Sequence, residues 1–286
     1  MASLREIRGR IRSIQNTAKI THAMELVAAA KMKRAQDLAN NGKPYSNLVN
    51  NVIRSIANRI NADSHPLLAR SSGETAAVIL FSTDRGLAGS INSNLFREIS
   101  SLAGSLKFIT IGKKARNFVV KSGKNLLADF PLSEGPDLAS VRPVISLVID
   151  GFLKKEFDEV YVVYTEFVST LRQVATVKQL LPIISKEILE ETARGAEALE
   201  KLEPLFEPDP DTVLESILPQ YILMELYQIL LETKASEHSA RMVAMKNATE
   251  NAGELVDDLT LTYNGIRQEA ITKEILDIST AAIALE

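Results

Sequence analysis

The chain has 286 residues, of which 45% are apolar, and a formal net charge of −3. This length predicts one or two domains with enough apolar surface for a buried core. The sequence contains no cysteine, which excludes disulfides, thiolate metal sites and thiol switches.

The first predicted element is a long helix over residues 1–60. Ser3 followed by Glu6 has the spacing of a capping box at a helix start. Apolar residues then recur at intervals of 3, 4, 3 and 4, which predicts a seam that packs on another helix. These seam positions are Leu4, Ile7, Ile11, Ile14 and Ala18. Asparagine, glycine and proline over residues 40–44 predict a break or bend near Leu38.

The middle of the chain has a different texture. Short apolar runs over residues 76–81, 107–111, 125–130, 159–164 and 174–180 predict strands. Helical stretches are expected over residues 92–102, after Gly112 and over residues 138–153. Strands that alternate with helices of this length predict a layered α/β domain with a largely parallel sheet, here over residues 75–205. The charged stretch 185–203 shows no clear pattern.

A second long helix is predicted over residues 208–286. Prolines and acids just before Thr212 are typical of a helix start, and Pro219, Gly253 and Gly265 interrupt the pattern only mildly. Its expected seam is Met245, Ala248, Ala252, Leu255 and Leu259. Such a helix would be roughly 110 Å long, so much of it must extend outward or enter another protein. The first helix should cover all but roughly 30 of its residues.

The two ends of the chain carry opposite charges. Residues 1–34 have eight Lys or Arg against two Glu, a local charge of +6, and residues 247–286 have eight Asp or Glu against two Lys or Arg, a local charge of −6. The cost of bringing the two ends together grows only logarithmically with the intervening length. The pattern therefore predicts that the terminal helices pair as a shaft and that the middle forms a head.

No self-contained active site is visible in the sequence. The Gly86–Gly89 turn lacks the three-glycine spacing of a dinucleotide site, no phosphate-binding loop of the GxxxxGK[ST] type occurs, and the three histidines have no metal-ligand spacing. We therefore expect no catalytic residue, no cofactor and no metal site. Two other functions stay open at this point: a DNA-associated or scaffolding coiled coil, suggested by the basic helix, and a dehydrogenase, suggested by the turn alone.

Helix packing does not explain one polar set near the C-terminus. It consists of Asn264, Arg267, Gln268, Thr272 and Glu274. Arg267 and Gln268 supply several hydrogen-bond donors on a narrow rod, which suits acidic or carbonyl partners.

Long ordered motifs along the chain resemble a known family. They are Ile7-Arg-Gly-Arg-Ile-Arg-Ser-Ile-Gln-Asn-Thr-Ala-Lys-Ile-Thr21, Ala23-Met24, Val27-Ala-Ala, Lys31-Met32, Thr83-Asp-Arg-Gly-Leu87, Phe206-Glu-Pro-Asp209, Arg241-Met-Val-Ala-Met245 and Ile271-Thr-Lys-Glu274. Together they make the whole chain similar to the gamma subunit of F-type ATP synthases. The chain departs from common family residues at His22, Ala88 and Ala281.

The resemblance implies both a fold and a role. The fold would be an antiparallel coiled coil of the two terminal helices plus a central Rossmann-like layered α/β domain. The role would be that of a non-catalytic central-stalk rotor, which turns inside the ring of alpha and beta subunits and couples proton or sodium flow to ATP synthesis. The complex would lie on the cytoplasmic face of the bacterial plasma membrane, with this chain as a peripheral subunit.

The resemblance also implies subunit contacts. Arg267 and Gln268 would meet the beta-subunit loop that grips the shaft, with Thr272 and Glu274 beside them. Met24 would lie in the matching contact region of the first helix. Phe206 and Glu207 would lie at the base, which meets the epsilon subunit and the membrane rotor ring.

Overall fold

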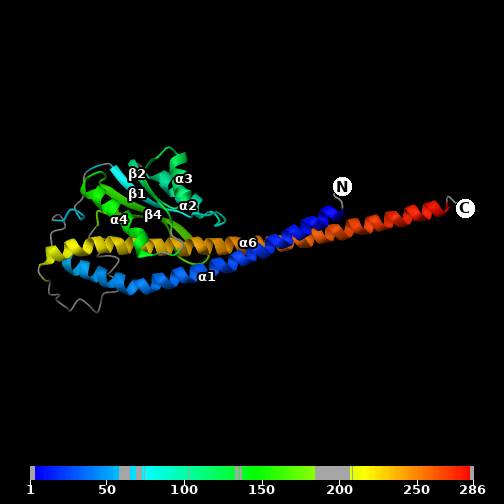
Figure 1. Cartoon of the computed structure of the whole chain (residues 1–286), viewed down its shortest axis with the longest axis horizontal. Coiled ribbons are helices and arrows are strands. Elements are labelled where there is room, and N and C mark those ends of the chain that lie inside the picture. Colours follow the sequence, from blue (N-terminus) through cyan, green and yellow to red (C-terminus); the bar gives the residue numbers. More distant parts are fainter. Residues whose placement is uncertain are drawn as a thin grey trace. The chain divides into compact units, whose positions relative to one another are not determined.

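The computed structural model describes residues 4–57, 65–68, 73, 75–102, 104–132, 135, 137–183, 207 and 209–283. The chain divides into two compact units, which we call the shaft unit (residues 1–29 and 241–286) and the α/β unit (residues 30–240). Helix α1 (Leu4–Ala57) and helix α6 (Pro210–Ile283) each contribute to both units (Figure 1). The two long terminal helices are confirmed, whereas the predicted domain limits 1–60, 75–205 and 208–286 stay a prediction.

A five-stranded sheet in the order β3-β2-β1-β4-β5 forms the centre of the α/β unit. Its strands are β1 (Thr75–Phe81), β2 (Ser105–Ile111), β3 (Asn125–Phe130), β4 (Glu159–Phe167) and β5 (Gln173–Leu181). The first four strands run parallel, and β5 pairs antiparallel with β4. In the register of the sheet, Val78 lies between Phe108 and Tyr161. The predicted layered fold with a largely parallel sheet is therefore confirmed.

Helices cover both faces of this sheet. Helices α2 (Ile91–Ser101) and α3 (Lys113–Lys121) pack on the face that contains Val78 and Leu80. Helix α4 (Leu138–Leu153) and residues 214–230 of α6 pack on the other face, with Ile79 and Phe81. Because β1 is buried on both sides, it reads in the sequence as a continuous apolar run rather than an alternating one.

Helix α1 continues through Pro44, so the expected break or bend at residues 40–44 does not end it. Proline lacks one backbone donor and costs about 3 kcal/mol inside a helix. Ala39 and Ile53, on either side of the proline, are both buried, and Ile53 belongs to the main core of the α/β unit. Burial of side chains along this stretch offsets the cost of the proline.

Helix α6 starts with a side-chain cap. The Asp209 carboxylate accepts hydrogen bonds from the Thr212 backbone N–H at 2.9 Å and from the Thr212 hydroxyl at 2.8 Å. This cap satisfies donors at the first turn, where the helix has no internal partner for them. The helix then runs for 74 residues and accommodates Pro219 near its start.

Polar contacts hold α6 against strands β4 and β5 and the turn that joins them. Ser236 and Ser239 donate to the carbonyls of Thr165 and Thr170 at 3.0 and 2.7 Å. Lys178 on β5 forms an ion pair with Glu225 of the helix at 2.8 Å. Glu232 lies in the same region, and its burial raises the pKa of its carboxyl. This part of α6 is therefore fixed to the sheet by specific hydrogen bonds as well as by apolar packing.

Candidate subunit-contact surface

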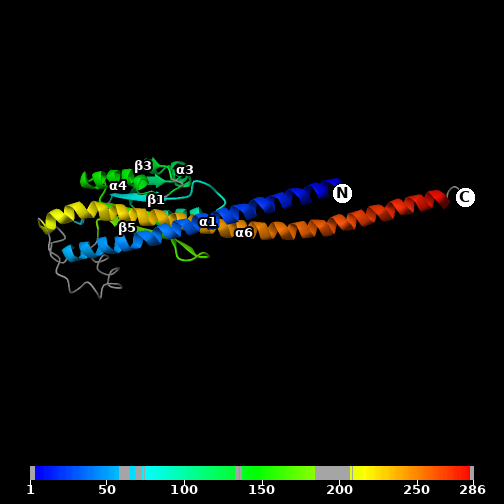
Figure 2. The same cartoon turned by 60° about the horizontal axis from the view of Figure 1, so that its bottom comes forward.

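Within the shaft unit, α1 and α6 lie side by side and run in opposite directions (Figures 1 and 2). The hydroxyls of Thr21 and Thr249 hydrogen-bond to each other across the two helices, with their oxygens 2.7 Å apart. Nearer the N-terminus, Nη2 of Arg8 donates to the hydroxyl of Tyr263. These two contacts fix the register of the antiparallel pair.

The register pairs the inward-facing positions of the two helices layer by layer. Equal steps from the Thr21–Thr249 contact bring Ala18 opposite Ala252, Ile14 opposite Val256, Ile11 opposite Leu259, Ile7 opposite Tyr263 and Leu4 opposite Ile266. All of these side chains are buried or half-buried. The predicted seam on α1 is therefore confirmed in full.

The predicted seam on α6 is wrong at one position. Leu255 is 48% exposed, and Val256 occupies the inward position in its place. On α1 the step from Ile14 to Ala18 is four residues, and an antiparallel partner must take the matching step of four from Ala252. The sequence of α6 alone allows a step of three or four, so only the pairing with α1 decides between the two residues.

Ion pairs between described residues of the shaft unit include pairs within a single helix. They link Arg10 with Glu6 and Lys246 with Glu250, and Nδ1 of His22 lies 3.2 Å from a carboxylate oxygen of Glu25 on the same helix. Exposed pairs of this kind contribute about 0–1 kcal/mol. The apolar layers and the contacts Thr21–Thr249 and Arg8–Tyr263 hold the described parts of the two helices together.

The end of α6 extends beyond its partner helix. Leu4, the first described residue of α1, lies opposite Ile266, and α6 continues for 17 further residues to Ile283, about 25 Å at 1.5 Å per residue. Every side chain described from Ile271 to Ala281 is exposed. The expected excess of roughly 30 residues was too long, because it was derived from helix lengths and not from a register.

Four of the predicted contact residues gather at this end. Arg267, Gln268, Thr272 and Glu274 are all exposed, and the Thr272 hydroxyl donates to the Gln268 carbonyl at 2.9 Å. Helical spacing places Arg267 and Glu274 on one stripe and Gln268 and Thr272 on the neighbouring one. The four side chains thus share one side of the rod.

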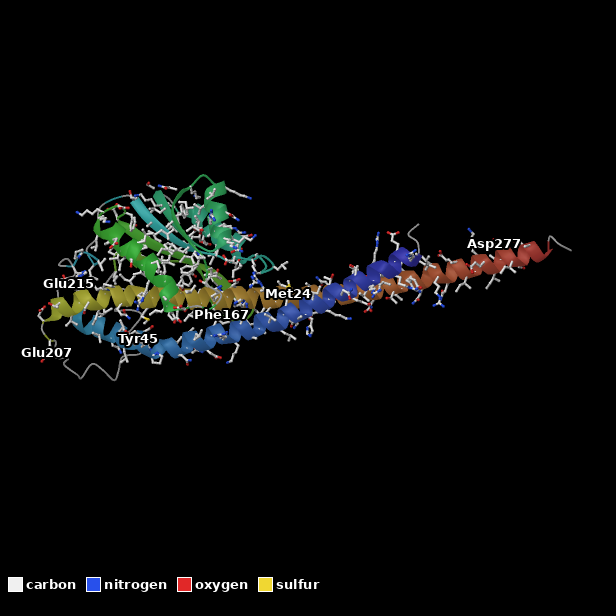
Figure 3. All side chains as sticks on the ribbon, in the orientation of Figure 1. Met24, Tyr45, Phe167, Glu207, Glu215 and Asp277 are labelled. Carbon is white, nitrogen blue, oxygen red and sulfur yellow. The ribbon has the colours of Figure 1, made fainter. Side chains whose placement is uncertain are left out.

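The other predicted contact residues lie elsewhere. Met24 lies on α1 (Figure 3), where it is half-buried. The register puts it about 31 Å along the shaft from Arg267. Glu207 is an exposed residue of the α/β unit, and Phe206 lies outside the described residues. The predicted contact residues of the shaft therefore lie at two different heights along it. That these residues contact other subunits stays a prediction.

Sequence reasoning missed a set of exposed apolar side chains on the shaft. They are Ile20, Leu26 and Val27 on α1, and Leu261, Ile271, Ile275, Leu276 and Ile278 on α6, each between 44% and 73% exposed. Adjacent pairs such as Leu26–Val27 and Ile275–Leu276 were the available signal, because the a and d positions of a coiled-coil seam are never adjacent in the sequence. Exposed apolar residues in such number are typical of a protein-binding surface.

The glycine-containing turn after β1 uses its polar groups internally. The Asp84 carboxylate accepts from the Lys113 backbone N–H at 2.8 Å, and the Ser82 hydroxyl accepts from the Ala115 backbone N–H at 2.7 Å. These side chains therefore tie the turn after β1 to the first turn of α3. In addition, no group of His, Cys, Asp and Glu among the described residues could hold a metal ion.

The whole chain matches known proteins. A family model described as ATP synthase matches residues 3–285. A protein of Opitutus terrae named ATP synthase gamma chain is 42% identical over 291 residues, with 99% of each chain covered. A protein of the same name in Methylacidiphilum infernorum is 43% identical over 292 residues, with all of each chain covered. The chain belongs to the ATP synthase gamma chain family. The DNA-associated coiled coil and the dehydrogenase are therefore set aside.

Solved structures of ATP synthase rotors share the fold. The rotor of the Euglena gracilis mitochondrial ATP synthase, in rotational state 1, aligns with a TM-score of 0.66 at 19% identity, over 94% of this chain and 98% of that one. A second Euglena gracilis structure, of the OSCP/F1/c-ring assembly in rotational state 3, aligns with a TM-score of 0.68 at 20% identity, over 99% of this chain and 94% of that one. None of the described helices is long and apolar enough to cross a membrane.

Proposed function

We propose that this chain is the central-stalk rotor of an ATP synthase and couples ion flow through the membrane to ATP synthesis or hydrolysis. The shaft unit turns inside a ring of alpha and beta subunits and contributes no catalytic group of its own. The observation that carries this proposal is the end of α6, where a continuous helix extends past its partner with every described side chain from Ile271 to Ala281 exposed. An isolated chain gains nothing from such a helix, whereas a surrounding partner would bury it.

The mechanism is mechanical and electrostatic. A rod made of two unlike helices presents a different set of side chains in each direction. Three equivalent catalytic subunits around it would each meet a different face, and each would be biased toward a different conformation by its own contacts. The exposed apolar residues supply burial, and Arg267 and Gln268 supply directed hydrogen bonds.

The proposed contacts with the ring lie at two heights along the shaft. Arg267, Gln268, Thr272 and Glu274 would meet the beta-subunit loop that grips the shaft, and Met24 would meet the ring about 31 Å lower. Phe206 and Glu207 would belong to the base, which meets the epsilon subunit and the membrane rotor ring. The chain would act as a peripheral subunit on the cytoplasmic face of the bacterial plasma membrane, with no cofactor of its own.

Reconstitution with purified alpha and beta subunits tests the proposal. Addition of the chain should change the rate of ATP hydrolysis and make the three catalytic sites unequal in nucleotide affinity. An unchanged rate together with three equal sites would refute the rotor function.

A pair of double variants tests the contact residues. Arg267→Ala with Gln268→Ala should weaken assembly or coupling by at least tenfold, since each removes directed hydrogen bonds to a partner. Glu250→Ala with Glu254→Ala changes two exposed side chains lower on the same helix and serves as the matched control. Equal small losses in both variants would show that the contact is misplaced.

A further inference from the structure

Arg8 and Tyr263 contact each other in two ways at once. The guanidinium carbon of Arg8 lies 5.4 Å from the centroid of the Tyr263 ring, and Nη2 of the same side chain donates to the ring hydroxyl. A cation beside an aromatic ring is attracted by the electron-rich face, and a hydrogen bond to the hydroxyl restrains the ring in its own plane. The pair, which we call the clamp, therefore fixes the orientation of Tyr263 as well as its distance from α1.

The clamp lies close to the end of the paired region. Only the layer of Leu4 and Ile266 follows it before the described part of α1 ends. Tyr263, which faces α1, precedes the exposed Arg267 by about one turn of the continuous helix α6. Whatever fixes the direction of Tyr263 therefore also fixes the direction of Arg267.

Each of the two helices carries an exposed glycine near the clamp. Gly9 on α1 and Gly265 on α6 flank the clamp, and a Cβ atom at either position would meet nothing within 4 Å. Glycine adds no packing and loosens a helix, and helix ends open more readily than helix centres. The Arg8–Tyr263 hydrogen bond crosses between the two helices near these glycines and adds a specific polar contact to the apolar layers.

We propose that the Arg8–Tyr263 clamp is a positioning device for the rotor contacts. It holds the end of α1 on α6 and sets the direction in which Arg267 and Gln268 face the surrounding ring. The second part rests on the proposed rotor function, whereas the first concerns the shaft unit alone. Arg8 and Tyr263 act here through their neighbours and need not touch a partner.

Pairs of spin labels on the full isolated chain test the first part. Because the chain has no cysteine, introduced cysteines are the only labelling sites. Gly9→Cys with Gly265→Cys gives the upper label pair, beside the clamp. Asn16→Cys with Gly253→Cys gives a reference pair lower on the shaft. Tyr263→Leu should raise the fraction of molecules in which the two labels of the upper pair lie far apart by about two- to fivefold. The distance distribution of the lower pair should not change. An unchanged upper pair would overturn the clamp.

A charge-matched control separates the clamp from general electrostatics. Arg8→Leu and Arg12→Leu each remove one positive charge from the same face of α1, because the two residues are four positions apart. Both arginines are exposed. Only Arg8→Leu should widen the distance distribution of the upper pair. Tyr263→Phe, which keeps the ring and loses the hydroxyl, should give an intermediate width. Equal widening in the two arginine variants would overturn the proposal.

The assembled complex tests the second part. Tyr263→Leu should lower the ratio of ion pumping to ATP hydrolysis by about two- to fivefold, and Tyr263→Phe should restore part of it. A widened upper label pair with an unchanged ratio would overturn the positioning role while the rotor function stands. Failure of the unaltered chain to associate with alpha and beta subunits would instead refute the rotor function and leave the clamp intact.

Discussion

The seam of the shaft unit can be tested at two neighbouring residues of α6. Val256 faces α1 opposite Ile14, whereas Leu255 is 48% exposed. An aspartate at position 256 would lose about 1–1.5 kcal/mol of apolar burial and would place a polar group against the seam at a further cost of about 1–3 kcal/mol. We therefore expect Val256→Asp to destabilise the paired helices by about 2–4 kcal/mol. Leu255→Asp should cost less than about 1 kcal/mol.

Hydrogen exchange of the backbone amides measures this difference. In Val256→Asp, amides of residues 4–28 and 245–266 should lose protection, and amides in strands β1 and β2 should keep theirs and report an intact α/β unit. The matched variant Leu255→Asp carries the same change in charge one residue away. Greater loss of protection in Leu255→Asp, or equal loss in both variants, would refute the register that places Val256 in the seam.

Three further predictions concern stability. Gly265→Ala should raise the helical stability of the shaft by about 0.5–1 kcal/mol in thermal unfolding, since its Cβ would meet nothing within 4 Å. Gly151→Ala should lower the melting temperature, because its Cβ would lie 2.6 Å from the Phe157 ring; an unchanged value would show that the ring moves freely. Glu232→Gln should raise the melting temperature at neutral and alkaline pH. Burial raises the pKa of Glu232 above the 4.5 of a free carboxyl. Ionisation of Glu232 therefore lowers the stability of the fold as the pH rises through the raised pKa. That gain should vanish below about pH 4, where the carboxyl is protonated in both states, and a gain that is constant with pH would contradict the reasoning.

The strands and most of the helices were predictable because their signals are local. The buried strand β1 and the helix over residues 138–153 appear in the sequence as a short apolar run and a longer one with helical spacing. Pro44 is a local signal of the same kind. It predicts a break or bend, and the break is wrong because burial of Ala39 and Ile53 keeps α1 continuous.

The candidate contact surface was only partly predictable. The polar residues from Arg267 to Glu274 were recognisable because packing within the chain gave no reason for them. The exposed apolar residues, such as Leu26 and Ile275, were not recognised, because an apolar residue in a helix is normally assigned to its seam. Their exposure becomes evident only when the true seam positions are known.

By itself, the sequence determined the two long terminal helices, the layered α/β fold between them and, through its long motifs, the family. Each of these depends on residue type and on spacing along one segment. The tertiary structure decided which residues of the two helices face each other, hence Val256 over Leu255 in the seam, and how far α6 extends beyond α1. The physical reason is that helical periodicity is a property of one chain segment, whereas register is a property of two and depends on contacts such as Thr21–Thr249 that join distant parts of the sequence.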